Sequence, residues 1–558
     1  MRNFKFKRSL TLLTVSSLLS LTVVSIPTVA RAADPACQTA NFVTQCAGTT
    51  SDSAPYLMLV PANFNGTVYL YSHGYRNNVP LPAALSAITG FPTTVVNAAE
   101  PVPGGSAAIY GPLLAKGYAV MGSGFARQGW NADSAIKTNV ELIGVFKKQF
   151  TKTKKVVAWG NSLGGFITQA LAEQYPDLIS AAAPMCMASD LPPLMTMAGD
   201  ALWGIKTFFD PTIKGGNYSA GAAGYAEAMG DLGKVFGVAD ALSKAFVANA
   251  VSPAWPATSK VPDAIKAIPS RSALVLVALM SGLPLQSAHF DATSGAAAMG
   301  SSITSFQIAI NPAFAALENL TTAAALGVLA THDIEQQAGG AVFDNSATDY
   351  AARVSAEQFV WSSALSGVSG TAGLLSVLAA SPRAKADAAA VAKLKTLASH
   401  SGKVEIPTIL FTGVADPVTI AGNQQSVADK YAAYYAEKWA AAKKEGIRVR
   451  PQNNQLVLWN FPPEKYTQFS GITPLTTGPA ATGTNHCNFT TSQYLAIADL
   501  LAYAAENGKN MSGGALLTKL RKAKNMTYDR GYSAPKIDRK STRLNSSHTI
   551  QSRMPSSA

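Results

Sequence analysis

The segment Lys155-Val-Val-Ala-Trp-Gly-Asn-Ser-Leu-Gly164 decides the fold of this chain. Residues 155–160 form an apolar run typical of a buried strand, and residues 163–174 have the pattern of a helix. Between them the motif G-x-S-x-G is centred on Ser162. A serine between a strand and a helix lies on a sharp turn that lifts its hydroxyl above the edge of a sheet. We therefore predict that Ser162 is a nucleophile.

Segments of strand and helix character alternate on both sides of this turn. Such alternation is typical of βαβ units, in which the strands are parallel and the helices cover the sheet. The fold class is therefore α/β, with a mostly parallel central sheet flanked by helices. Strands are predicted over residues 67–72, 118–125, 155–160, 178–187, 404–412 and 456–461, and helices over 131–150, 163–174, 423–444 and 491–506.

A long segment between these strands has a different character. It contains Ala-rich stretches at 222–250, 304–330 and 372–399, a composition that favours helix. We predict that residues 188–403 form a helical cap or lid, inserted after the strand that follows the nucleophile helix. The sheet domain then has two parts, residues 33–187 and residues 404–537.

The sequences of both ends of the chain differ from that expected of a folded domain. A basic start, an apolar run and the step Ala30-Arg31-Ala32 predict a signal peptide over residues 1–32, and hence a secreted or periplasmic protein without a stable membrane anchor. Residues 538–558 resemble the translation of a sequencing adapter, and we predict that they are not native. Most of the formal net charge of +13 lies in these two ends, so the remainder does not favour nucleic-acid binding.

The strand, the serine turn and the helix resemble those of the α/β-hydrolase superfamily, over residues 55–187 and 404–507. In that family the catalytic residues follow the order serine, acid, histidine, with the histidine in a loop after the last strand. Only His486 lies there, apart from His548 in the adapter-like tail.

The resemblance also locates the acid, which is expected after a late strand. Asp416 directly follows the strand predicted at 404–412 and is the first candidate, with Asp190 as the alternative. In such a triad the imidazole removes the serine proton, and the carboxylate orients the imidazole and stabilises its cation. Ser162, Asp416 and His486 are therefore the predicted catalytic residues.

The tetrahedral oxyanion needs preorganised donors, which the resemblance places on two segments. One is the backbone N–H of Leu163, and the other is the N–H of Tyr75 in the segment Ser72-His73-Gly74-Tyr75, which is similar to the family's His-Gly oxyanion loop. His73 is expected to brace this loop rather than to transfer a proton.

The four cysteines suit an exported protein, where disulfides form. Cys37 and Cys46 are close in sequence and are predicted to pair. In the α/β-hydrolase fold Cys186 and Cys487 would lie at the same rim, which implies a second disulfide that tethers the His486 loop. Tannases and feruloyl esterases carry a similar His-Cys step, but there the partner cysteine precedes the serine, a place that Asn161 occupies here.

Apolar side chains early in the cap segment could line a substrate pocket, and for most of them a place in the cap's own core is the alternative. No zinc-type spacing, phosphate-binding loop or dinucleotide fingerprint occurs in the sequence, so we expect no metal and no cofactor. The candidate pocket residues are Met187, Leu191, Met195 and Trp203.

These features predict a secreted serine hydrolase that cleaves carboxylic esters through an acyl-enzyme. The large cap suggests a bulky, apolar or aromatic ester as the substrate, including oligomeric esters. An exported serine peptidase or amidase is the nearest alternative, because the same triad cleaves amides. A non-catalytic binding protein on the same fold is a third hypothesis. The sequence leaves the oligomeric state open.

Overall fold

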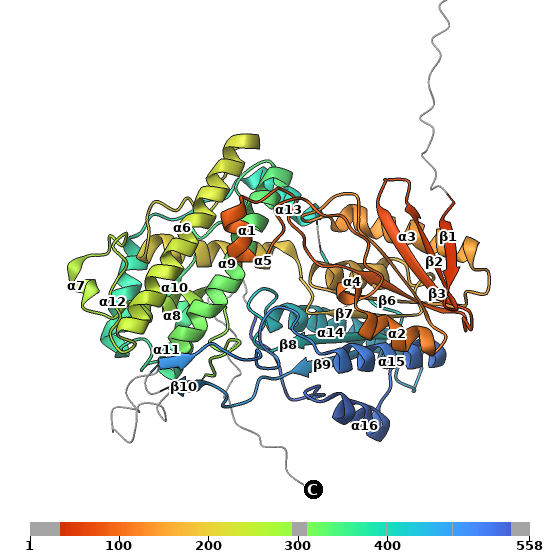
Figure 1. The fold of residues 1–558 in the computed structure, drawn as a ribbon. Helices are drawn as coiled ribbons and strands as arrows, with labels where there is room; N and C mark the ends of the chain where they lie inside the picture. The colour runs from red at the N-terminus through yellow and green to blue at the C-terminus, as the bar shows by residue number, and fades with distance from the viewer. Residues whose placement is uncertain (1–33, 293–309, 398, 471–472, 537–558) are drawn as a thin grey trace, which may run out of the picture.

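A nine-stranded sheet forms the centre of the protein in the computed structural model, which describes residues 34–292, 310–397, 399–470 and 473–536 (Figure 1). The strand order is β1-β2-β3-β5-β4-β6-β7-β8-β9. The strands are β1 (Ala36–Ala40), β2 (Val43–Thr49), β3 (Pro55–Pro61), β4 (Thr67–Ser72), β5 (Ala119–Ser123), β6 (Lys155–Asn161), β7 (Ala181–Met185), β8 (Thr408–Gly413) and β9 (Gln455–Asn460).

The six strands from β5 to β9 along this order run parallel, and β1, β2 and β3 join them as an antiparallel edge. The sequence predicted the six parallel strands and missed the three antiparallel ones. The residues of β1 are all exposed, so no alternation of apolar and polar residues marks this strand. The disulfide Cys37–Cys46 joins β1 to β2 at directly opposed positions.

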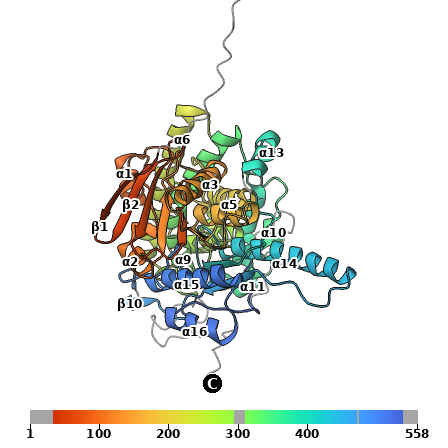
Figure 2. The same ribbon diagram turned by 90° about the vertical axis from the view of Figure 1, so that its right-hand side faces the viewer.

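Helices cover both faces of this sheet. Along β4, Val68 and Leu70 pack toward α3 (Ala132–Gln149) and α4 (Leu163–Gln174). The alternate residues Tyr69 and Tyr71 pack toward the opposite side, as the period of two in a strand requires. The helices of that side are α2 (Ala107–Ala115), α15 (Thr491–Asn507) and α16 (Gly513–Ala523), and Figure 2 shows α3 above the sheet and α15 and α16 below it.

The chain between β7 and β8 contains helices and no strand within its described residues, as Figure 1 shows on the left. These helices have a hydrophobic core of their own. The Ala-rich stretch predicted at 372–399 is broken near Pro382. The helices are α5 (Leu191–Phe208), α6 (Gly221–Ala248), α7 (Asp263–Lys266), α8 (Ser270–Ser281), α9 (Asn311–Ala338), α10 (Tyr350–Val354), α11 (Glu357–Val360), α12 (Gly367–Ala380) and α13 (Ala388–Leu397).

The remaining elements are α1 (Ala83–Thr89), α14 (Ala421–Lys444) and a small sheet of β10 (Gln468–Ser470) and β11 (Thr473–Leu475). Within the described residues, α9 is the one helix whose length and hydropathy would allow it to cross a membrane, and 61% of its most apolar stretch is buried inside the protein. Packing within the cap accounts for this apolar character. The predicted signal peptide and adapter-like tail lie outside the described residues.

Two glycines let α4 pack directly against the sheet beside the serine turn. A Cβ atom on Gly164 would overlap the carbonyl oxygen of Ser72 on β4, and one on Gly160 would overlap the carbonyl oxygen of Gly164. Because these obstacles are backbone atoms, no change of side-chain rotamer could make room. Only glycine permits this close approach of helix to strand.

We expect Gly164→Ala to lower the free energy of unfolding by about 3 kcal/mol or more, because the added methyl group must displace the backbone of β4. Gly144→Ala is the matched control: Gly144 is exposed on α3 and a Cβ there meets nothing within 4 Å. That change should stabilise α3 by about 0.5 to 1 kcal/mol. Thermal unfolding followed by circular dichroism measures both effects, and equal Tm values for the two variants would contradict the argument.

Candidate active site

Ser162 occupies the sharp turn that the motif predicts. Its backbone has φ 58° and ψ −122°, a conformation that a residue with a side chain rarely adopts. The turn is held because the Ser162 N–H donates to the carbonyl oxygen of Met185 on β7 at 3.1 Å, and the N–H of Ala188 donates to the Ser162 carbonyl oxygen at 3.1 Å. The strained backbone therefore fixes the position of the hydroxyl.

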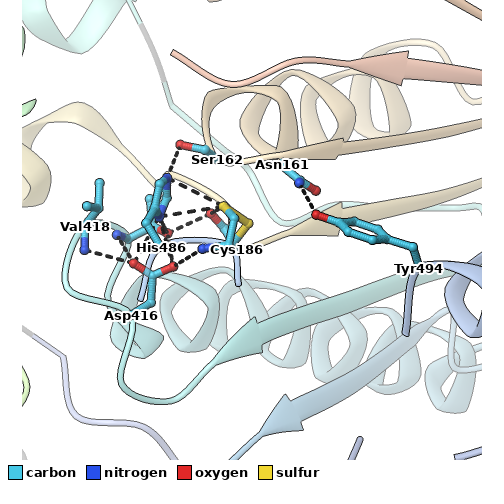
Figure 3. A network of polar contacts seen from close by, with 9 residues as sticks. Asn161, Ser162, Cys186, Asp416, Val418, His486 and Tyr494 are labelled. Carbon is cyan, nitrogen blue, oxygen red and sulfur yellow. Dashed lines mark hydrogen bonds and ion pairs between the residues drawn. A yellow bond between two sulfur atoms is a disulfide. The ribbon is translucent and has the colours of Figure 1, made fainter. Parts of the chain in front are cut away.

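His486 and Asp416 lie next to this hydroxyl, although both are more than 250 residues away in the sequence. The Nε2 atom of His486 is 2.8 Å from the Ser162 Oγ atom, and its Nδ1 atom is 3.0 Å from each carboxylate oxygen of Asp416. Figure 3 shows the three side chains in line. Because a carboxylate only accepts, the Nδ1 atom carries a proton, and Nε2 is free to accept one from the serine.

Asp416 is completely buried, and backbone donors hold its carboxylate. The N–H groups of Val418 and Thr419 donate to Oδ1 at 2.9 and 3.0 Å, and the N–H of Cys487 donates to Oδ2 at 3.1 Å. With the imidazole bond, both oxygens are satisfied, as a buried carboxylate requires. The carboxylate thus has one orientation, and that orientation sets the plane of the His486 ring.

The disulfide Cys186–Cys487 ties the loop that carries His486 to the end of β7. The two cysteines are 301 residues apart in the chain, and their Cα atoms lie 5.4 Å apart. Both residues have a positive φ, as does Asn485, so the loop is bent on each side of the histidine. The loop ends at the N-cap of α15, where Thr490 and Gln493 form a capping box.

Leu163 and Tyr75, whose N–H groups are the predicted oxyanion donors, line the same cavity as Ser162. Leu163 is the first residue of α4, so its N–H has no acceptor within the helix. Gly74 passes close to the serine: a Cβ added there would lie 3.2 Å from the Ser162 Cβ atom. The next residue, Tyr75, lines the same cavity as Ser162, and its N–H donates to no acceptor in the described part of the chain.

His73 is buried behind this loop. Its Nδ1 atom is 2.7 Å from the carbonyl oxygen of Gly74, and its ring packs on Phe125 with the ring centres 4.6 Å apart. Burial, reinforced by the charge of Arg76, lowers the pKa of His73 to about 4. A neutral imidazole that donates to its own loop fits the predicted brace.

An apolar cavity of about 110 Å³ opens at Ser162 and continues into the cap. Leu191 and Met195 line it, whereas Met187 and Trp203 are not among its lining residues. Met187 points toward Leu410 and Val427 because it leaves β7 on the side of α14. Trp203 stacks on Tyr350 inside the cap. These two residues were wrongly assigned because the sequence alone does not tell whether a buried apolar side chain faces a cavity or packs in a core.

Asp333 on α9 was missed by sequence reasoning, although it connects the cap to the predicted oxyanion loop. One carboxylate oxygen accepts from the Trp130 N–H at 2.6 Å and from the Tyr75 hydroxyl at 3.4 Å, and the other accepts from Asn78 Nδ2 at 2.7 Å. Burial raises the pKa of Asp333, and the hydrogen bond from Trp130 opposes this effect. Nothing in the local sequence signals this role, because these three partners lie 203 to 258 residues away.

The alternative acid, Asp190, is engaged elsewhere. It forms an ion pair with Lys430 at 2.5 Å and accepts from the His400 N–H at 2.8 Å. Asn161, which stands where tannases and feruloyl esterases have a cysteine, donates from Nδ2 to the Tyr494 hydroxyl at 2.6 Å (Figure 3). The structure therefore brings Asp416, and not Asp190, to the histidine.

Asp416, His486 and Cys487 are the one group of three acidic, histidine or cysteine side chains in the described residues whose atoms are close enough to share a metal ion. The Cys487 sulfur is bonded to Cys186, so it offers no thiolate. The two imidazole nitrogens already face Asp416 and Ser162. This donor set suits proton transfer rather than metal ligation.

Protonation of His73 makes the stability of the folded protein depend on pH. Its pKa is about 4 in the folded protein and 6.5 in an unfolded chain, so between these values the unfolded state binds a proton that the folded state does not. His73 alone should therefore lower the free energy of unfolding by about 2 kcal/mol between about pH 7 and about pH 5. The Tm of the wild type should drop more steeply over this range than that of His73→Asn, and parallel curves would contradict this.

Comparison with known proteins gives low similarities. No family model matches the chain, and no curated protein matches it. Among solved structures, feruloyl esterase B from Aspergillus oryzae is 12% identical with a TM-score of 0.31, over 81% of this chain and 75% of that one. The cell-wall-degrading esterase LipA from Xanthomonas oryzae is 11% identical with a TM-score of 0.30, over 78% and 92% of the two chains. The esterase Pf2001 from Pyrococcus furiosus is 15% identical with a TM-score of 0.20, and the match spans 30% of this chain and 63% of that one.

Because these values are low, the fold is assigned from the chain's own features. The sheet is mostly parallel, the serine lies on a strained turn between β6 and α4, and the residues around it follow the order serine, aspartate, histidine. Together these features identify the fold of this chain as that of the α/β-hydrolases.

Proposed function

We propose that this protein is a serine hydrolase that cleaves carboxylic esters, with Ser162 as the nucleophile, His486 as the general base and acid, and Asp416 as the orienting carboxylate. The observation that carries the proposal is the continuous chain of contacts, 2.8 Å from Oγ to Nε2 and 3.0 Å from Nδ1 to the carboxylate. These distances are within reach for proton transfer. The presence of all three residues in mutual contact speaks against a non-catalytic binding protein.

The reaction begins when the Ser162 Oγ atom attacks the ester carbonyl carbon and its proton passes to His486 Nε2. The carbonyl oxygen becomes an oxyanion, which the N–H groups of Leu163 and Tyr75 would stabilise. Collapse of this tetrahedral intermediate breaks the bond between the carbonyl carbon and the alcohol oxygen, and the alcohol takes the proton from Nε2. A water molecule then attacks the acyl-enzyme by the same route, releasing the acid and restoring Ser162.

The apolar cavity favours esters over peptides as substrates. A bound peptide needs hydrogen-bond partners for its backbone, and the cavity is lined almost wholly by aliphatic side chains. A bulky, apolar ester instead loses only the hydrogen bonds of its ester group, which the oxyanion donors would replace. The proposed binding partner is a small-molecule or oligomeric ester substrate. We expect no nucleic-acid partner.

Two disulfides support export of the protein, because such bonds persist in oxidising compartments. With the predicted signal peptide, they favour a secreted or periplasmic enzyme. This location would give the hydrolase access to esters outside the cytoplasm.

Labelling with a fluorophosphonate probe tests the nucleophile. The probe should modify Ser162, as located by peptide mapping, and Ser162→Ala and His486→Ala should each lose at least about a thousandfold in turnover of p-nitrophenyl esters. Circular dichroism should show both variants to be folded. Near-normal turnover by Ser162→Ala would refute the assignment.

Two aspartate variants test the orienting acid. Asp416→Asn should lower kcat by about four orders of magnitude, because the amide favours the wrong tautomer of His486. Asp190→Asn is the matched control, since Asp190 contacts Lys430 instead of the histidine, and it should change kcat less than about threefold. If Asp190→Asn has the larger effect, the acid belongs to the loop after β7.

A panel of matched substrates separates the ester hydrolase from the peptidase hypothesis. We expect p-nitrophenyl octanoate to be cleaved far faster, relative to its uncatalysed hydrolysis, than octanoyl p-nitroanilide or short peptide anilides. The first two substrates carry the same octanoyl group, so they differ only in whether the leaving group is attached through oxygen or nitrogen. Preference for the anilides would establish an amidase.

A further inference from the structure

The cavity that opens at Ser162 continues between two antiparallel cap helices, α5 and α9. Its lining residues on α5 recur every three or four positions from Leu191 to Ile205, and those on α9 do so from Leu320 to Ile334. Such spacing marks one continuous face of each helix. The cavity therefore has two helical walls that face each other.

Both walls start at the catalytic residues. Ala188, just before α5, bonds to the Ser162 carbonyl oxygen, and Asp333, near the end of α9, contacts the Tyr75 hydroxyl. From the serine, the cavity-lining face of α5 runs from Leu191 to Ile205, and that of α9 runs from Ile334 back to Leu320, so the two faces cover the same number of residues. At a rise of 1.5 Å per residue, each face is about 21 Å long. The space is thus elongated, and the ester bond would lie at one end of it.

Away from Ser162, the cavity offers nothing polar to a ligand within the described residues. The lining hydroxyls are those of Ser162, Tyr75 and Thr419, all at the catalytic end. The Tyr75 hydroxyl donates to Asp333, and that of Thr419 donates to the Cys186 carbonyl oxygen. A phenol, sugar or second ester group placed deeper would lose its hydrogen bonds to water without replacement.

Small residues on α9 create the space. The cavity-lining residues of α9 include Ala323, Ala324, Gly327 and Ala330. The opposite wall, on α5, includes Leu194, Ala198 and Ala201. A Cβ atom on Gly327 would meet nothing within 4 Å, and the backbone there is helical, so a side chain is sterically allowed. Glycine weakens a helix interior, and here it leaves the middle of the wall open.

We propose that this cavity binds the linear, unsubstituted acyl chain of the substrate, so that the preferred substrates are esters of medium- and long-chain fatty acids. The inference rests on the proposed function and narrows its substrate class. The carbonyl carbon would lie at Ser162 Oγ and the hydrocarbon chain between α5 and α9. Phenolic acids and oligomers of hydroxy acids are excluded as acyl groups.

Rates for p-nitrophenyl acetate, butyrate, octanoate, dodecanoate and palmitate test this directly on the wild-type protein. Each methylene that enters the cavity should raise kcat/KM about fourfold until the chain fills it, so the optimum lies at octanoate or longer. Methyl octanoate should also be hydrolysed faster than methyl hydroxycinnamate. An optimum at acetate, or preference for the hydroxycinnamate, would overturn the proposal.

Gly327→Leu plugs the cavity in the middle of α9. We expect it to lower the ratio of kcat/KM for dodecanoate to that for butyrate by at least about tenfold, because a leucine side chain occupies the volume of several methylenes. Gly237→Leu is the matched control, since Gly237 is an exposed glycine inside cap helix α6 whose Cβ would also meet nothing within 4 Å. It should leave the ratio unchanged. An unchanged ratio in Gly327→Leu, with the protein folded, would overturn the proposal.

Binding of dodecanoate separates failure of this inference from failure of the proposed function. If Ser162 is labelled and acetate is hydrolysed without any preference for longer chains, the hydrolase stands and the acyl site is refuted. If no ester is hydrolysed, the proposed function fails, and calorimetry with dodecanoate still tests the cavity. Binding by the wild type that Gly327→Leu abolishes would support the acyl site, and absence of binding would refute it.

Discussion

The close packing of α4 against β4 and β6 is the constraint on which the site depends. The backbone carbonyl oxygens of Ser72 and Gly164 occupy the space that a side chain at Gly164 or Gly160 would need. With glycine at both positions, the chain can reverse direction within one residue, and Ser162 takes up the strain of that reversal. The position of the Ser162 hydroxyl therefore depends first on the backbone of this turn.

The other two residues of the proposed triad are fixed by bonds that come from distant parts of the chain. Three backbone N–H groups hold the Asp416 carboxylate, and one of them belongs to Cys487, next to the histidine. The Cys186–Cys487 disulfide joins the same loop to β7, the strand beside the serine turn. The loop is thus attached to the sheet by a covalent bond and to the acid by a hydrogen bond, which limits how far the imidazole can move from the serine.

The cap contributes in two ways to the chemistry proposed for this site. Its helices α5 and α9 supply the apolar walls, and Asp333 on α9 holds Tyr75, Asn78 and Trp130 with a single carboxylate. A buried carboxylate with several donors defines their positions closely, because each unpaired donor would be costly. The same helix therefore shapes the space for the substrate and supports the loop that carries a predicted oxyanion donor.

The sequence by itself indicated the parallel strands, the serine turn and the three residues Ser162, Asp416 and His486 that the fold brings into contact, because each depends on a local pattern or on order along the chain. It also indicated both disulfide pairings, the second through family resemblance. It missed the antiparallel strands β1 to β3, the hydrogen bonds that Asp333 accepts from Tyr75, Asn78 and Trp130, and the course of the cavity. It also wrongly placed Met187 and Trp203 in that cavity. The contacts of Asp333, the cavity and the places of Met187 and Trp203 depend on which faces of α5, α9 and α14 meet in space. Apolar residues look alike in sequence whether they pack in a core or line a cavity, so only the tertiary structure decides between them.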